Sequence, residues 1–163
     1  MALTRLGTNA ITSVPSSAIT ALPAGVGGKV LQQITSVYGT ATSTTSSSFV
    51  TTNLSASITP SSTSNKILII FNINSISVND ISTGAGISLF RDSTEIFSTE
   101  EYCAYNDGSS VNYSNAGASY LDTPSSTSSI NYNLKFKRNL GSGTISIHAN
   151  NRGSSITLME IAG

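Results

Sequence analysis

Hydrophobic and polar residues alternate with a period of two through most of the chain after residue 29. Ile67, Ile69 and Phe71 fall on one side of such a segment, and Ile145 and Ile147 on one side of another. This period places successive side chains on opposite faces, as in a β-strand with one buried face. The pattern predicts nine strands, over residues 30–38, 49–59, 66–78, 87–91, 94–97, 114–121, 130–138, 144–148 and 155–161.

Turn-forming residues separate these strands. Residues 91–94, 140–143 and 150–153 are rich in Asp, Asn, Ser and Gly, and we expect a hairpin turn at each. No segment has the pattern of a helix of ordinary length. Short strands with frequent turns favour a sandwich or a jelly roll. We therefore predict an all-β fold, a jelly-roll-like antiparallel β-sandwich, over residues 29–163.

The last predicted strand is apolar on both faces near its end. Leu158 belongs to one face, and Met159 and Ile161 belong to the other. A strand of this kind is either central in its sheet or part of a subunit interface. These three residues are therefore candidates for an oligomer interface.

The first 28 residues have a different pattern, in which an Ala, aliphatic, Thr, any residue, aliphatic unit recurs every eight residues. Pro15 and Pro23 exclude one continuous helix, and a period of eight fits no heptad coiled coil. The segment has no core of its own, so it is either disordered or extended against a partner. We favour an extended attachment segment over residues 1–28, in which the partner buries the repeated aliphatic residues Leu3, Leu6, Ile11, Val14, Ile19 and Leu22.

A second repeat occurs in the later part of the chain. The run Thr-Pro-Ser-Ser-Thr-Ser occupies residues 59–64 and again residues 123–128, each time after an apolar strand end. Two equivalent crossover loops of a double Greek key would explain the repeat. Chance reuse of a Ser/Thr-rich loop is an equally good explanation.

The composition indicates what the surface is made of. Ser and Thr make up roughly a third of the chain, while charged residues make up 10%. The ordinary charged fraction is about 25%. Net charge is zero, whereas binding to nucleic acid or to an anionic membrane needs concentrated Lys and Arg. We expect no nucleic-acid partner, no membrane insertion and a polar surface built from short hydroxyl side chains.

Residues that would carry chemistry are scarce. Cys103 and His148 are the only residues of their kinds, so neither a disulfide nor a zinc cluster of Cys and His can form within the chain. Glycoside cleavage needs two carboxylates about 5–9 Å apart, but adjacent Glu100 and Glu101 would point to opposite faces of a strand. We predict no cofactor, no catalytic residue and no enzymatic activity.

One stretch, residues 98–120, combines four of the six tyrosines with Asn and acidic residues. Tyr offers an apolar ring with a hydroxyl, and Asn and Asp supply hydrogen bonds, which suits recognition of a host glycan or protein. The alternative is that some of these tyrosines pack in the core or in a subunit interface. The candidate receptor-binding residues are Tyr102, Tyr105, Asn106, Asp107, Asn112 and Tyr113.

Five segments of the chain together resemble a family of marine bacteriophage and cyanophage tail-fibre-like virion proteins. They are residues 1–7, 24–32, 54–68, 120–124 and the C-terminal Ile-Thr-Leu-Met-Glu-Ile-Ala at 156–162. The resemblance covers nearly the whole chain, and it implies a trimeric β-rich knob whose N-terminal segment attaches it to the particle. It supplies no catalytic residues. Many members have a longer N-terminal region, which favours a short appendage here.

These observations lead to one preferred hypothesis and two alternatives. We expect a phage tail-fibre or short-appendage protein, made in the host cytoplasm and placed on the virion surface, that uses its sandwich for host attachment. Its partners would be two further copies of itself and other virion proteins, the latter bound through residues 1–28. A capsid decoration or cement protein without receptor binding is the main alternative. A polysaccharide-degrading enzyme is a distant third.

Overall fold

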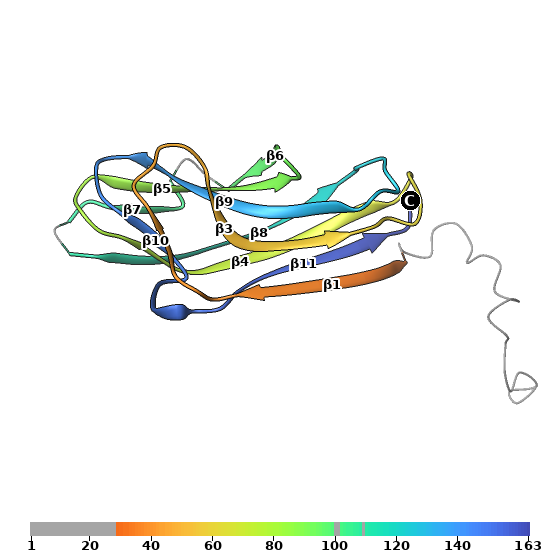
Figure 1. Ribbon diagram of the computed structural model, residues 1–163, viewed down its shortest axis with the longest axis horizontal. Helices are drawn as coiled ribbons and strands as arrows, with labels where there is room; N and C mark the ends of the chain where they lie inside the picture. Colours follow the sequence, from red (N-terminus) through yellow and green to blue (C-terminus); the bar gives the residue numbers. More distant parts are fainter. Residues whose placement is uncertain (1–28, 100–101, 109) are drawn as a thin grey trace, which may run out of the picture.

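The computed structural model describes residues 29–99, 102–108 and 110–163, which form two antiparallel β-sheets packed face to face (Figure 1). The first sheet contains β1 (Val30–Tyr38), β2 (Thr42–Thr44), β4 (Lys66–Val78), β8 (Asn112–Asp122), β10 (Ile145–Ile147) and β11 (Ser154–Ile161). The second sheet contains β3 (Val50–Ile58), β5 (Thr83–Arg91), β6 (Thr94–Ser98), β7 (Ala104–Asn106) and β9 (Ile130–Leu140). The all-β sandwich predicted from the alternation is confirmed.

The strand order is that of a jelly roll. The first sheet runs β1-β11-β4-β8, with β10 and β2 continuing beyond β11 along the same edge of β4. The second sheet runs β3-β9-β5-β6, with β7 beside β5. The chain passes from one sheet to the other after β2, β3, β4, β7, β8 and β9, so that most neighbours within a sheet, apart from β5 and β6, are distant in sequence. Two interleaved Greek keys of this kind define the fold.

The core fills the space between the sheets with the inward-facing residues of both. Ile67, Ile69, Phe71 and Ile73 of β4 face it from one side, and the strands of the second sheet contribute Ile87, Leu89, Tyr132, Leu134 and Phe136 from the other. Each of these side chains is at most 2% exposed. Burial of apolar surface by two complementary faces is the main stabilising term of such a sandwich.

Both copies of the Thr-Pro-Ser-Ser-Thr-Ser repeat lie at the same end of the sandwich. The first copy joins β3 to β4 and the second joins β8 to β9, so each carries the chain from one sheet to the other. Because Ile67 pairs with Asp122, the start of β4 and the end of β8 are neighbours there. Both copies are therefore crossover loops, as the first of the two explanations requires.

One of the three predicted hairpins is confirmed and two are not. Arg91 pairs with Thr94 in the β5-β6 hairpin, as predicted. The other two predictions were wrong, because β9 and β10 belong to different sheets, and β10 and β11 both pair with β4 rather than with each other. Between β10 and β11 the chain forms a short 3-10 turn, Ala149–Asn151, in which Asn150 and Asn151 adopt left-handed φ values of 58° and 54°.

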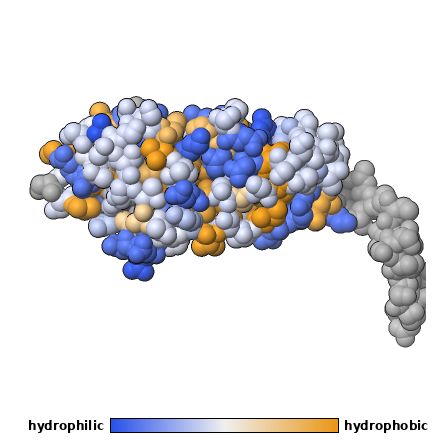
Figure 2. Space-filling view, in the orientation of Figure 1, coloured by the Kyte–Doolittle hydropathy of each residue, from blue (hydrophilic) through white to orange (hydrophobic). Residues whose placement is uncertain are grey.

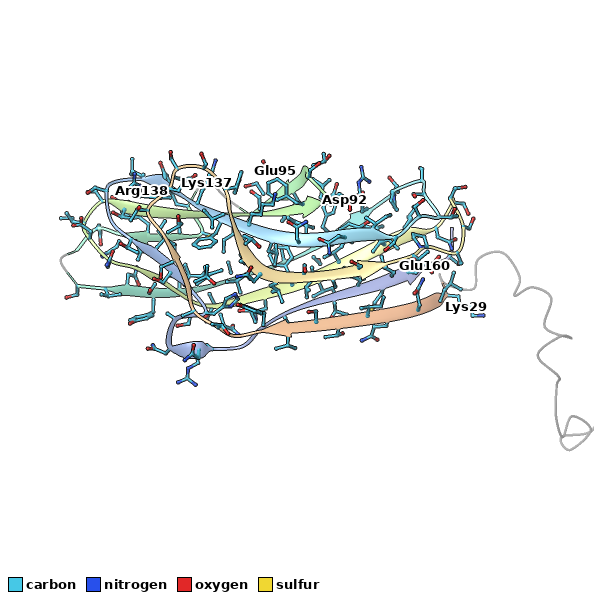
Figure 3. The ribbon with its side chains drawn as sticks, viewed as in Figure 1. Lys29, Asp92, Glu95, Lys137, Arg138 and Glu160 are labelled. Carbon is cyan, nitrogen blue, oxygen red and sulfur yellow. The ribbon has the colours of Figure 1, made fainter. Side chains whose placement is uncertain are left out.

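Charged residues are concentrated on the second sheet and at its edges. Figure 3 labels Asp92, Glu95, Lys137 and Arg138 along this side of the molecule. There Lys135 Nζ lies 4.2 Å from the centre of the Phe90 ring, and a similar Lys137–Phe49 contact lies beside it. Much of the face in Figure 2 is pale, the colour of residues such as Ser and Thr. In the part of the chain that the structure describes, no helix is long and apolar enough to span a bilayer.

Candidate functional site

A groove of about 560 Å³ opens on the first sheet, at the end away from the crossover loops. Three separate segments line it: the middle of β4, the start of β8 and the turn before β11. Its lining residues are Asn74, Ser75, Tyr113, Ser114, Asn115, Asn150, Arg152 and Gly153. We call it the Tyr113 groove. In Figure 2 a hydrophilic projection at the lower left marks the turn that forms one of its walls.

A β-bulge in β4 shapes the floor of this groove. Ile73 pairs with Ala116 and Ile76 pairs with Ser114, so Asn74 and Ser75 together oppose the single residue Asn115. Ser75 adopts a left-handed φ of 53°, and its N–H donates to Asn115 Oδ1 at 2.8 Å. A bulge re-aims the side chains around it. Here it brings polar side chains of β4 and β8 to one spot.

Asn74 joins the bulge to the opposite wall. Its side-chain Nδ2 donates to the carbonyl oxygen of Gly153 at 2.6 Å, and its backbone N–H donates to Ser154 Oγ at 2.8 Å. The turn before β11 is therefore fixed against β4 by two hydrogen bonds from a single residue.

The buried His148 supports this arrangement from beneath. Its Nε2 lies 3.2 Å from the Thr52 carbonyl oxygen, and since a carbonyl only accepts, Nε2 carries the proton. Nδ1 therefore accepts from Ser154 Oγ at 2.8 Å. A chain of hydrogen bonds thus runs from Asn74 through Ser154 and His148 to Thr52 of the second sheet. Burial lowers the pKa of His148 from its ordinary 6.5, although the bond to Thr52 opposes this shift.

The predicted receptor-binding residues separate into two groups. Tyr113 is 56% exposed and lines the groove, whereas Tyr105, Asp107 and Asn112 are exposed but lie outside its lining. The Asn112 amide donates to the carbonyl oxygen of Tyr105 at 2.6 Å. Sequence reasoning identified Tyr113 from local composition alone. It missed Asn74, Ser75, Asn150 and Arg152, which lie on distant segments.

The remaining members of that set are structural. Asn106 is 3% exposed, its Nδ2 donates to the carbonyls of Val78 and Ser110, and its Oδ1 accepts from Gly108 N. The assignment of Asn106 to receptor binding was wrong, because its whole amide is used inside the fold. The Tyr102 ring packs over Gly84, where a Cβ atom would collide with it. This contact explains a glycine within β5.

The candidate interface residues point to different faces of β11. Leu158 is fully buried in the core, so it was wrongly assigned to an oligomer interface. Met159 and Ile161 point outward from β11, which is central in its sheet between β1 and β4. Met159 pairs with Leu68, and Leu68 pairs with Leu121, so the three lie in one row across the outer face. We call this row, with Ile70 and Ile161 beside it, the apolar strip.

The apolar strip lies at the end of the sheet near Val30, where residues 1–28 join the sandwich. Leu121 is 49% exposed and Ile70 is 42% exposed. The predicted attachment residues Leu3, Leu6, Ile11, Val14, Ile19 and Leu22 lie outside the described residues.

The same end of the sandwich holds a buried carboxylate. Glu160 is 1% exposed and accepts hydrogen bonds from Gln32 Nε2, Asn65 Nδ2, Ser61 N and Ser61 Oγ, at 2.6 to 2.8 Å. Figure 3 places it beside Lys29, at the start of the described chain. Burial alone would raise the pKa of Glu160, but the hydrogen bonds from Asn65, Gln32 and Ser61 lower it from 4.5 to about 2. Glu160 therefore fixes the first crossover loop to β1 and β11.

A second carboxylate network lies by the second crossover loop. Asp122 forms an ion pair with Arg91 at 3.0 Å and accepts from the Tyr132 hydroxyl at 2.7 Å. Burial, followed by the hydrogen bond to Asp122, raises the pKa of Tyr132 far above its ordinary 10. Within residues 29–99, 102–108 and 110–163, no three His, Cys, Asp or Glu side chains gather closely enough to hold a metal ion.

Comparison with known proteins gives only distant similarities. No family model matches the chain, and no curated protein matches it. Among solved structures, the VP2 subviral particle of infectious bursal disease virus matches 82% of this chain at 10% identity with a TM-score of 0.47. T=1 particles derived from infectious bursal virus match with a TM-score of 0.43 at 10% identity, again over 82% of this chain. This chain spans only 38% and 37% of those two proteins.

Proposed function

We propose that this chain is a structural protein of a bacteriophage virion surface, a tail fibre or short appendage that contacts the host. Residues 1–28 would attach it to the particle, and the jelly roll would present the Tyr113 groove outward. One observation carries the proposal: the groove lies well along β4 from Lys66, beside which the described chain begins. Eight residues separate Lys66 from Asn74, which corresponds to about 25 Å of extended strand.

The surface chemistry supports a role in binding rather than in catalysis. The eight residues that line the groove include Tyr, Asn, Ser and Arg side chains but no carboxylate. Two carboxylates are what most glycoside hydrolases use. Recognition residues usually lie in loops on a rigid scaffold, and the turn before β11 supplies part of this groove.

Exposed apolar surface at the crossover end supports the same proposal. The apolar strip is uncharged except for Lys66 at its margin. It lies beside Val30, close to the first described residue. Exposed contiguous apolar surface marks interaction sites. We propose that it packs against sister copies, as the resemblance to trimeric virion knobs implies. The mass of the intact protein in solution tests this, and Met159→Lys should shift that mass toward the monomer.

The attachment is tested by removing residues 1–23. The truncated protein should remain folded, because the hydrogen bonds of β1 and of the Glu160 network all lie after residue 28. It should no longer join particles that lack the natural protein. Incorporation of the truncated protein at an undiminished level would refute the attachment role of this segment.

Host contact is tested with the isolated sandwich. We expect residues 29–163 to bind host cells, and Tyr113→Ala to weaken that binding. The apolar strip also favours a second candidate function, a capsid cement protein that clamps neighbouring subunits and binds no receptor. In that case, particles lacking the protein would lose heat stability, and neither the sandwich nor the whole protein would bind cells.

A further inference from the structure

We infer that the Tyr113 groove is a binding site for an anionic saccharide, in which the Tyr113 ring stacks on a sugar and Arg152 pairs with a carboxylate of that sugar. This inference rests on the proposed function and names the class of receptor. It depends on which polar groups of the groove form hydrogen bonds within the fold, which do not, and how the latter are arranged.

The fold uses some groups of the groove to build its walls. Ser75 N, Asn115 Oδ1 and Asn74 Nδ2 are all committed to the hydrogen bonds of the bulge and the turn. Among the described residues, no protein hydrogen bond occupies the Tyr113 hydroxyl, Asn115 Nδ2 or the Arg152 guanidinium. The groove therefore keeps donors of three kinds available for a ligand.

A saccharide satisfies this set better than other ligands. Its hydroxyls both donate and accept, and so can bond to amides and hydroxyls at once, while its C–H face packs on an aromatic ring. A lipid or apolar peptide would find few apolar partners, since Tyr113 is the only large apolar surface among the lining residues. The volume of 560 Å³ is also within the usual range for small-ligand sites, about 300–1,000 Å³.

The charge of the groove selects an anionic ligand. Arg152 is the only charged residue among the eight that line it, and it is exposed at the rim. A guanidinium presents parallel N–H groups that match the two oxygens of a carboxylate. None of the other seven lining residues carries a charge, so Arg152 alone sets the charge of this lining.

The groove is also rigid before any ligand arrives. Ser75, Asn150 and Asn151 are held in left-handed conformations, and the hydrogen bonds of Asn74 close the bulge against the turn. Asparagine adopts this conformation readily, whereas serine does so less often, and the hydrogen bond from Ser75 N to Asn115 Oδ1 accompanies it here. A pre-formed groove loses less conformational freedom on binding, which favours a weakly anchored polar ligand.

The test is titration calorimetry of the whole protein with three probes of equal length: alginate oligosaccharides, which carry carboxylates, sulfated galactose oligosaccharides and neutral malto-oligosaccharides. We expect alginate oligosaccharides to bind at least ten-fold more tightly than the neutral ones. Arg152→Gln should remove most of that preference, at least ten-fold in affinity for the acidic probe, while affinity for the neutral probe stays unchanged. Arg138→Gln is the matched control for charge, because Arg138 lies outside the groove.

The aromatic contact has its own matched pair. Tyr113→Ala should weaken binding of acidic and neutral probes alike, whereas Ile81→Ala, at an equally exposed apolar residue outside the groove, should leave both unchanged. Each variant is accepted only if its thermal midpoint stays within a few degrees of the natural protein.

The outcomes separate this inference from the proposed function. Tighter binding of the sulfated probe than of alginate would overturn the carboxylate assignment. Equal affinity for acidic and neutral probes, or full affinity in Arg152→Gln, would overturn the ionic contact while host-cell binding by the sandwich stands. Absence of any cell binding by the natural protein would instead overturn the proposed function itself.

Discussion

The two ends of the sandwich use the same kinds of residue for opposite purposes. At the crossover end, Ser61, Asn65 and Glu160 direct their polar groups at one another inside the fold. At the groove end, Tyr113 and Arg152 direct theirs at solvent. Polar groups that are buried and satisfied fix a structure, whereas polar groups that are aligned but unsatisfied can serve a ligand. If the groove binds a ligand as proposed, stability and recognition are separated along the long axis of the domain.

This comparison predicts that the largest loss of stability comes from the crossover end. Glu160→Gln should lower the free energy of unfolding by about 3 kcal/mol, because an amide cannot accept from four donors and adds two donors of its own. Urea denaturation at pH 7 measures the change. Glu95→Gln, at an exposed carboxylate outside the network, should change it by less than about 0.5 kcal/mol.

The pH dependence of stability identifies the same group. The pKa of Glu160 is about 2 in the folded protein and 4.5 in the unfolded one, so its contribution is complete above pH 4.5 and is lost as the pH falls toward 2. Glu160→Gln should remove this part of the acid dependence. A variant that keeps the natural acid profile would contradict the assignment.

The second carboxylate network should show a smaller effect. Asp122→Asn should cost about 2 kcal/mol, because it leaves the Arg91 guanidinium without a charged partner. Tyr132→Phe should cost about 1 kcal/mol, since Asp122 keeps its ion pair with Arg91 and loses only a hydroxyl donor. A double-mutant cycle between Asp122 and Tyr132 measures their coupling, and strict additivity would show that the hydrogen bond contributes nothing.

We expect a still smaller effect on the free energy of unfolding from His148, which lies beneath the groove. The pKa of His148 is lower in the folded protein than in the unfolded one, so the unfolded chain binds the proton more readily. The contribution of this group to stability should be complete above about pH 6.5 and smaller at pH 5.5. Chemical denaturation at both pH values measures this, and His148→Gln should abolish the difference.

The smallest effect on stability is expected in the groove itself. Arg152→Gln and Tyr113→Ala should each change the free energy of unfolding by less than about 0.5 kcal/mol, because both side chains are exposed and bonded to no described residue. Thermal denaturation checks this. A larger loss would mean that these side chains support the fold, and the contrast between the two ends would then fail.

Sequence analysis predicted the crossover end far better than the groove. Alternation of Ile67, Ile69 and Phe71 fixes which face of β4 is buried, and the repeated Thr-Pro-Ser-Ser-Thr-Ser run marks both loops. The strand over Thr83–Arg91 was predicted too short, because the glycines at its start carry no side chain to show a period. Gly84 is there to make room for Tyr102, a contact that no local pattern reveals.

The groove could not be derived because it joins three segments that are distant in sequence. Tyr113 and Ser75 meet only through the register of β4 and β8, and Arg152 arrives by a turn that resembles a hairpin in sequence. The bulge that opens the floor depends on a left-handed serine, a conformation that composition does not predict. The role of Glu160 was likewise hidden, since alternation places it on the same face as Leu158 but does not reveal its four donors.

Both ends of the described chain lie together at the crossover end. The N–H of Ala162 donates to the carbonyl of Lys29 at 3.0 Å, and Gly163 N donates to Asn65 Oδ1. A short linker could therefore join residue 163 to residue 29, and a circular permutant could be opened at the opposite end instead. Residues 1–28 would then be fused beside the groove. The jelly roll would attach to the particle by its groove end and expose its crossover end.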